Sequence, residues 1–105
     1  NSLYEKRVVK TLFERKKEML KIADGFIALP GGIGTLDEIT EVLALLQLRQ
    51  LAKPIGFLNL NGFYTPLFAM LRHFHENALT HHSLEKYMVI TQEPKDLLDS
   101  LMRKI

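Results

Sequence analysis

A short apolar run ends in a glycine-rich turn, and this junction limits the folds open to the chain. Residues 26–29 read Phe-Ile-Ala-Leu, and residues 30–38 continue as Pro-Gly-Gly-Ile-Gly-Thr-Leu-Asp-Glu. A continuous apolar run of this length is typical of a strand that is buried on both faces of a parallel sheet. The glycines permit a tight turn, and residues 35–51 carry apolar side chains at helical spacing. The sequence therefore predicts a strand, a turn and a helix in direct succession.

Strand and helix patterns alternate along the rest of the chain. Alternation with helices of ten or more residues predicts βαβ units, and therefore an α/β fold with a Rossmann-like, doubly wound parallel sheet. Because four strands are few for this architecture, we expect residues 1–105 to be the C-terminal part of a single Rossmann-like nucleotide-binding domain, with further strands N-terminal to Asn1. The predicted strands are residues 7–10, 25–29, 54–59 and 87–91. The predicted helices are residues 11–23, 35–51 and 64–78, and a last helix that begins at Pro94 and includes Leu97 to Met102.

Composition excludes several classes of function. The chain has no cysteine, which excludes a thiolate nucleophile and fits a reducing compartment, so we expect a cytoplasmic protein. The net charge is only +2, and no stripe of Lys and Arg is interleaved with aromatic residues, so we expect no nucleic-acid partner. No apolar run approaches the ~20 residues of a membrane span, so we expect no membrane partner.

The histidines do not form a metal-binding pattern. They occupy positions 73, 75, 81 and 82, and no pair has the i, i+4 spacing of a His-Glu-x-x-His zinc site. We therefore expect no metal site.

The glycine turn is predicted to bind an anion. In open parallel sheets, ligands bind at the carboxyl ends of the strands, and the first N–H groups of a helix point towards a bound anion. The glycine order matches neither the Gly-x-Gly-x-x-Gly pattern of dinucleotide sites nor the Gly-Lys-Ser/Thr pattern of triphosphate loops. The spacing of the glycines alone therefore predicts an anion site of the size of a monophosphate. Thr35 is expected to be the N-cap, with a hydroxyl that can face either the helix or the anion.

Glu38 has two interpretations. Residues 35–38 fit the capping-box pattern, in which a glutamate side chain reaches back to the N-cap amide, and by pattern alone this interpretation is favoured. Asp37 and Glu38 are both expected in the first helical turn, where the helix dipole favours negative charge. The alternative is a functional carboxylate one turn beyond the anion site. Residues 11–14, Thr-Leu-Phe-Glu, repeat the pattern, and there we interpret it as capping.

The basic pair Arg15-Lys16 is also open to two interpretations. Positive charge early in the helix predicted for residues 11–23 opposes the helix dipole, and an anionic ligand would offset that cost. The arginine would then face the ligand as a fork-shaped donor. The competing interpretation is a solvated basic face that also includes Lys17 and Lys21, and the residues alone favour it.

Two other segments suggest secondary roles. Asn59, Asn61 and Gly62 follow a predicted strand, and turn formation is favoured over contact with a ligand. The predicted helix of residues 35–51 has more apolar surface than one sheet face requires, because Leu45 and Leu48 widen its apolar stripe. A homodimer would cover the surplus, and so would a further part of the protein.

The motifs resemble a known family. Residues 13–16, Phe-Glu-Arg-Lys, and residues 23–38 resemble the Lonely Guy (LOG) family of cytokinin riboside 5′-monophosphate phosphoribohydrolases, whose members are often labelled possible lysine decarboxylases. The family signatures are an Arg-Lys pair and Pro-Gly-Gly-x-Gly-Thr-x-x-Glu, and both are intact. The likeness continues through residues 53–64 and 94–98 and so covers nearly the whole chain. The chain departs from the family in lacking its N-terminal half, and in having Phe13 where many members have His.

The resemblance implies a reaction and a set of site residues. The reaction is hydrolysis of the N-glycosidic bond of an adenosine 5′-monophosphate, including N6-modified forms, to give the free base and ribose 5-phosphate. It implies a homodimer and no cofactor. A carboxylate suits the oxocarbenium-like transition state of such a reaction. The implied catalytic pair is Arg15 and Glu38, and the implied substrate-binding residues are Lys16, Pro30, Gly31, Gly32, Ile33, Gly34 and Thr35.

Two other functions compete with the hydrolase. One is a non-catalytic carrier of nucleotides or cofactors from the same superfamily, such as the molybdenum-cofactor carriers. The other is a pyridoxal-phosphate lysine decarboxylase, which needs a Schiff-base lysine and an acidic partner for the pyridine nitrogen. Neither Lys16 nor Lys53 has such a setting in the sequence.

Overall fold

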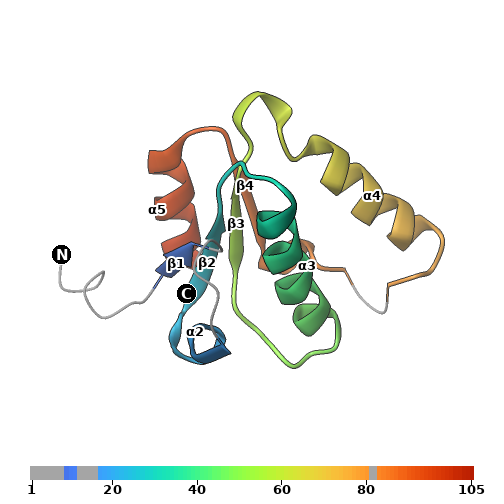
Figure 1. The fold of residues 1–105 in the computed structure, drawn as a ribbon, viewed down its shortest axis with the longest axis horizontal. Coiled ribbons are helices and arrows are strands. Elements are labelled where there is room, and N and C mark those ends of the chain that lie inside the picture. Colours follow the sequence, from blue (N-terminus) through green and yellow to red (C-terminus); the bar gives the residue numbers. More distant parts are fainter. Residues whose placement is uncertain (1–8, 12–16, 81–82) are drawn as a thin grey trace.

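The structure, a computed structural model, describes residues 9–11, 17–80 and 83–105. Four parallel strands form one open sheet in the order β1-β2-β3-β4 (Figure 1). Parallel strands joined by helices confirm the predicted α/β class, and the arrangement is that of a partial Rossmann-like fold. The strands are β1 Val9–Thr11, β2 Gly25–Ala28, β3 Ile55–Leu58 and β4 Met88–Thr91.

Helices cover both faces of the sheet. Figure 1 shows α5 on one face and α3 and α4 on the other, so the molecule has three layers.

No helix in the described part of the chain is long and apolar enough to cross a membrane. The helices are α2 Lys17–Ile22, α3 Ile33–Gln47, α4 Thr65–Glu76 and α5 Pro94–Lys104, with short 3-10 turns η1 Leu60–Gly62 and η2 Glu85–Tyr87.

Two apolar cores lie on opposite faces of the sheet because successive strand residues point to opposite sides. Phe26 and Phe57 point into the larger core, against α3, whereas Ile27 and Leu58 pack in the smaller core, against α5. Burial on both faces explains why the central strands are continuous apolar runs in the sequence. The buried α3 side chains of the larger core are Ile39, Val42, Leu43 and Leu46, and those of α5 in the smaller core are Leu97 and Leu101.

Several helix boundaries differ from the predictions. Thr11 is the last residue of β1, so it does not begin a helix as predicted, and the rest of its proposed capping box lies outside the described residues. Helix α3 begins two residues before the predicted start and ends at Gln47 rather than near residue 51. The early end has a local cause, since the N–H of Gln50 donates to the carbonyl of Leu45 at 2.9 Å and closes the helix.

Helix α4 ends in a left-handed residue that is not glycine. Ala78 has φ +57°, and the N–H of the following Leu79 donates to the carbonyl of Phe74 at 2.8 Å. This is the bond of a Schellman motif, in which glycine is the usual left-handed residue. A Cβ in that conformation costs about 1 kcal/mol.

We predict that Ala78→Gly stabilises the protein by about 0.5–1 kcal/mol, because it removes this strain at the end of α4. Ala69→Gly is the matched control, since Ala69 is exposed within the same helix and its replacement should destabilise by about 1 kcal/mol. Urea denaturation of the three proteins measures both changes. Two changes of the same sign would contradict the prediction.

Candidate functional site

The glycine turn lies at the carboxyl edge of the sheet. In Figure 1 the connections from β2 to α3, from β3 to α4 and from β4 to α5 all lie at the same edge. Leu29 directly follows β2, and Asn59 directly follows β3, its neighbour in the sheet. Ligands of open parallel sheets bind at this edge. The structure therefore places the predicted anion site where the fold favours one.

Helix α3 begins on the turn itself. Its N-cap is Gly32, whose carbonyl accepts the first helical hydrogen bond from the N–H of Leu36 at 3.0 Å. The N–H groups of Ile33, Gly34 and Thr35 precede that bond and so have no partner within the helix. They lie at the positive end of the helix dipole, which is a favourable position for an anion.

The predicted capping role of Thr35 is wrong. Thr35 is the third residue of α3, the N-cap makes no side-chain hydrogen bond, and the first turn contains no acidic residue. The capping box with Glu38 and the first-turn position of Asp37 are therefore also wrong. The physical reason is that glycine can serve as an N-cap without a side chain, which lets the helix start at Ile33.

Thr35 instead packs against the turn. A Cβ built on Gly31 would overlap the hydroxyl of Thr35 and lie only 2.9 Å from its Cβ. The side chain of Thr35 thus occupies the space that any other residue at position 31 would need. This close approach explains the glycine at position 31 by packing alone.

Packing does not explain the other two glycines. A Cβ on Gly32 or on Gly34 would meet no atom within 4 Å. Gly34 is moreover the second residue of α3, where glycine is a poor helix former compared with alanine. Both positions therefore leave open space next to the outward N–H groups of the helix start.

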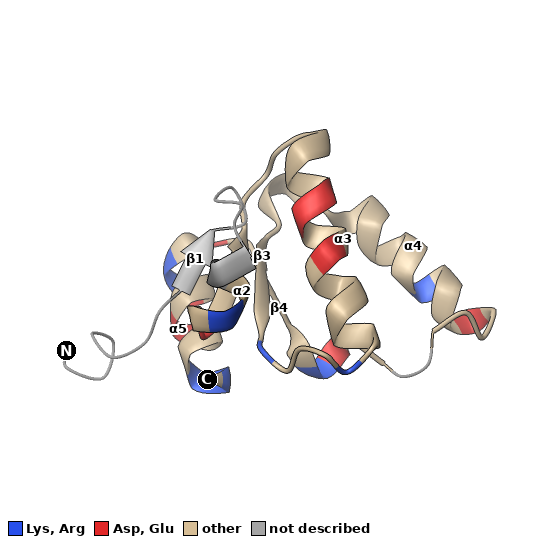
Figure 2. Ribbon diagram, turned by 60° about the horizontal axis from the view of Figure 1, so that its bottom comes forward, with Lys and Arg blue, Asp and Glu red and all other residues tan. Residues whose placement is uncertain are grey.

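Glu38 is buried one turn after Gly34. Helix α3 has three acidic residues and no Lys or Arg, and the acidic positions are the red parts of its ribbon in Figure 2. Glu38 alone among the three is buried, with 9% of its surface exposed. Positions 34 and 38 share one face of the helix because they are four residues apart. A buried carboxylate needs polar partners, and Glu38 has one or more. Glu38 is thus a buried acidic residue one helical turn after the open position of Gly34.

The predicted partners of Glu38, Arg15 and Lys16, lie outside the described residues, so their pairing with it stays a prediction. The helix that follows them is held firmly. The ammonium group of Lys53 donates to the carbonyls of Leu20 and Lys21, at 2.7 and 2.8 Å. These contacts join α2 to the segment that leads into β3.

Tyr64 contributes a contact that the sequence did not predict. Its hydroxyl donates to the carbonyl of Leu29 at 2.5 Å, and its N–H donates to Oδ1 of Asn59 at 2.6 Å. Burial raises the pKa of the Tyr64 phenol, so the hydroxyl keeps its proton. The contact of Asn59, together with positive φ values at Asn61 and Gly62, confirms these three as turn residues.

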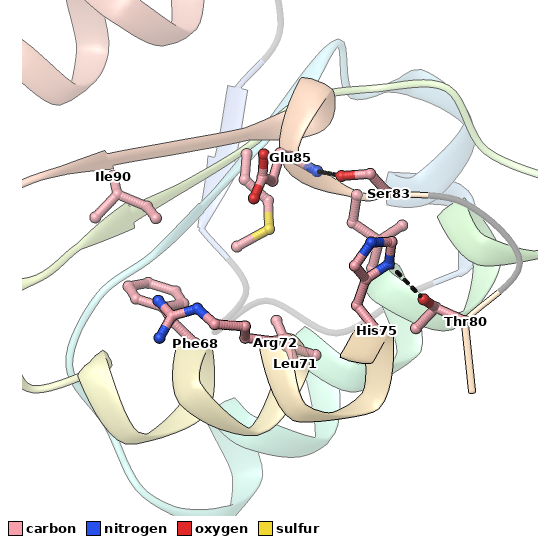
Figure 3. Close-up of a pocket in the computed structure, with 10 residues that line it drawn as sticks. Phe68, Leu71, Arg72, His75, Thr80, Ser83, Glu85 and Ile90 are labelled. Atoms are coloured by element: carbon pink, nitrogen blue, oxygen red, sulfur yellow. Dashed lines mark hydrogen bonds between the residues drawn. The ribbon is translucent and has the colours of Figure 1, made fainter. Parts of the chain in front are cut away.

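A cavity of about 390 Å³ lies elsewhere, between α4 and β4. Figure 3 shows Phe68, Arg72 and His75 of α4 on one side and Glu85 and Ile90 on the other. None of the predicted site residues lines it, so it is separate from the glycine turn. Within residues 9–11, 17–80 and 83–105, no group of three acidic or histidine side chains could hold a metal ion.

Substitutions of the tightly packed Gly31 and of the open Gly34 should affect the stability of the protein differently. Gly31→Ala should destabilise the protein by about 1–3 kcal/mol, because the new Cβ displaces Thr35. Gly34→Ala should leave stability unchanged or raise it by up to about 1 kcal/mol, since the position is helical and open. Thermal and urea unfolding measure both, and equal destabilisation by the two substitutions would contradict the assignment.

The chain is similar to known proteins over a range that includes the basic pair and the glycine turn. Residues 1–101 match the family described as possible lysine decarboxylase. Two relatives from Oryza sativa subsp. japonica are probable cytokinin riboside 5′-monophosphate phosphoribohydrolases. LOGL2 is 40% identical, and the match covers 92% of this chain and 40% of LOGL2. LOG4 is 39% identical, and the match covers 95% of this chain and 44% of LOG4. The cytokinin riboside 5′-monophosphate phosphoribohydrolase LOG of the same plant is 51% identical over 64% of this chain and 28% of its own.

The chain spans less than half the length of these curated relatives. Within that span the similarity covers both motifs that suggested the resemblance, because the family match includes the basic pair and the glycine turn. These matches confirm the resemblance to the Lonely Guy proteins, and the chain belongs to the family described as possible lysine decarboxylase.

Proposed function

We propose that this chain is the phosphate-binding and catalytic part of a nucleoside 5′-monophosphate phosphoribohydrolase. One observation carries the proposal: Gly32 and Gly34 leave open space at the start of α3, one turn before the buried carboxylate of Glu38. An anion site next to a buried carboxylate suits a substrate with a phosphate close to the bond that breaks. The names of the relatives, which are phosphoribohydrolases of cytokinin riboside 5′-monophosphates, support the same substrate class.

In this proposal the 5′-phosphate binds at the start of α3. The main-chain N–H groups of residues 31–35 donate to the phosphate oxygens, and the helix dipole stabilises the negative charge. The absence of side chains at two glycines lets the phosphate approach the backbone closely. Ile33 thus takes part through its main-chain N–H group, and the remaining contacts that we propose come from Lys16 and Pro30.

Glu38 then acts on the ribose. Water adds to the anomeric carbon as the N-glycosidic bond breaks, and the bond electrons leave with the base. The water loses one proton, and the base gains one. The transition state resembles an oxocarbenium ion, which the Glu38 carboxylate stabilises, and the same group can orient the attacking water. Arg15 supplies a permanent positive charge for the phosphate or for the departing base.

Two observations argue against the alternative functions, the nucleotide carrier and the decarboxylase. A non-catalytic nucleotide carrier would need the glycine turn but gives no reason for a buried glutamate beside it. A pyridoxal-phosphate decarboxylase would need a free lysine amine, whereas the Lys53 ammonium is bound to two main-chain carbonyls. An absorbance spectrum of bound pyridoxal phosphate would revive the decarboxylase.

We also propose that the protein is a homodimer in the cytoplasm and that residues 1–105 form the C-terminal part of one nucleotide-binding domain. Exposed apolar side chains at the two ends of α3 support an interface: Ile33, its first residue, is 82% exposed, and Leu48, directly after its last residue, is 59% exposed. Such residues favour burial against a second subunit or another part of the protein.

We predict that Glu38→Gln and Arg15→Ala each lower the rate of base release from AMP and N6-modified AMP by at least about 10²-fold. Glu38→Gln removes the carboxylate that stabilises the transition state, and Arg15→Ala removes the positive charge beside the phosphate or the departing base. The assay follows free base by chromatography, and circular dichroism checks that the variants stay folded.

Glu41→Gln is the matched control for Glu38→Gln, because Glu41 is an exposed glutamate of the same helix. It should retain the normal rate. A folded Glu38→Gln protein that hydrolyses these nucleotides as fast as Glu41→Gln would refute the mechanism.

Gly34→Ala should separate binding from stability. The added methyl group fills the open space at the start of α3, so the Kd for AMP should rise about tenfold or more while the protein remains at least as stable. Thr40→Ala, an exposed change in the same helix, should leave the Kd unchanged. Calorimetric titration with AMP measures both, and equal affinity in the two variants would contradict a phosphate at this place.

A further inference from the structure

Tyr64 joins two loops that lie far apart in the sequence. Its hydroxyl donates to the carbonyl of Leu29, which is 35 residues away and immediately precedes Pro30 and the glycine turn. Nothing in the proposed chemistry uses the phenol as an acid, a base or a ligand. Its hydrogen bond therefore needs another explanation.

The phenol is rigidly held. Tyr64 is only 5% exposed, and its ring meets those of Phe57 and Phe63 edge to face, with centroids 5.3 and 5.0 Å apart. The main chain is fixed as well, because the N–H of Tyr64 donates to Asn59 and the N–H of Asn59 donates to the carbonyl of Thr91 at 2.7 Å. The hydroxyl is thus connected to both β3 and β4.

The glycine turn, in contrast, has little packing of its own. Residues 29–34 are all exposed, and Leu29 itself is 45% exposed. The contact between Gly31 and Thr35 holds the turn to α3, but it does not hold the turn to the sheet. The bond to the Leu29 carbonyl supplies that second connection at the point where the chain enters the turn.

We propose that Tyr64 is a positioning residue that sets the place of the glycine turn, and with it the place of the amides that bind the substrate phosphate. This inference rests on the proposed function. The phosphate does not react, so weaker phosphate contacts lower ground-state and transition-state binding equally. Loss of the Tyr64 hydroxyl should therefore raise KM and leave kcat nearly unchanged. The catalytic Glu38 is spared because α3 is anchored by its own buried side chains.

The kinetic test is Tyr64→Phe in the complete protein. We expect KM for AMP to rise about tenfold, with kcat within about threefold of the wild-type value. Tyr87→Phe is the matched control, because Tyr87 is a half-buried tyrosine beside β4 whose ring packs against the larger core. It should leave both constants unchanged. A Tyr64→Phe protein with the KM of Tyr87→Phe, or with a loss confined to kcat, would overturn the inference.

A second measurement tests the inference without catalysis. Hydrogen exchange of the Leu36 amide, which donates to the Gly32 carbonyl of the turn, should be about tenfold faster in Tyr64→Phe than in Tyr87→Phe, with equal exchange in β3 and β4. Equal exchange at Leu36 in the two variants would overturn the positioning role. If the wild-type protein releases no base from AMP, the proposed function fails, and the exchange result alone then decides whether Tyr64 holds the turn.

Discussion

Burial of β2 and β3 on both faces is the constraint on which the rest of the structure depends. Phe26 and Phe57 pack against α3, and Ile27 and Leu58 pack in the core beside α5. Parallel pairing of these strands places Leu29 and Asn59 at one edge of the sheet, since each directly follows its strand. The glycine turn and the Tyr64 loop meet there as a consequence. The candidate site is thus a product of sheet packing, although it lies outside either core.

Two connections then fix the turn in that place. The Thr35 side chain fills the space above Gly31 and joins the turn to α3, while the Tyr64 hydroxyl joins it to the loop after β3. Main-chain amides at the helix start can bind an anion without reorganising only if they are held in this way. Tight support around an exposed, open helix start is what a preorganised anion site requires.

Much of the fold could be predicted from the sequence, because strand burial and helix periodicity are local patterns. The strands at residues 25–29 and 54–59 were predicted within one residue at each end. The start of α3 was not, because Thr35 and Glu38 fit a capping box while Gly32 proved a sufficient N-cap. The bond from Tyr64 to Leu29 joins residues 35 positions apart, and no local pattern could indicate it. The pairing of Arg15 with Glu38 stays a prediction, since Arg15 lies outside the described residues.

Two residues of α3 lower the stability of the protein and thereby support the proposed function. Gly34 weakens a helix in which alanine would fit, because a Cβ there would meet no neighbour. Glu38, four residues later, takes a carboxylate out of water, which costs free energy even when the group is paired. Exceptions to the rules of folding gather at functional sites, because elsewhere a more stable residue carries no penalty. Two such exceptions on one helical turn, next to N–H groups that have no partner within the helix, support the proposal that a ligand binds there.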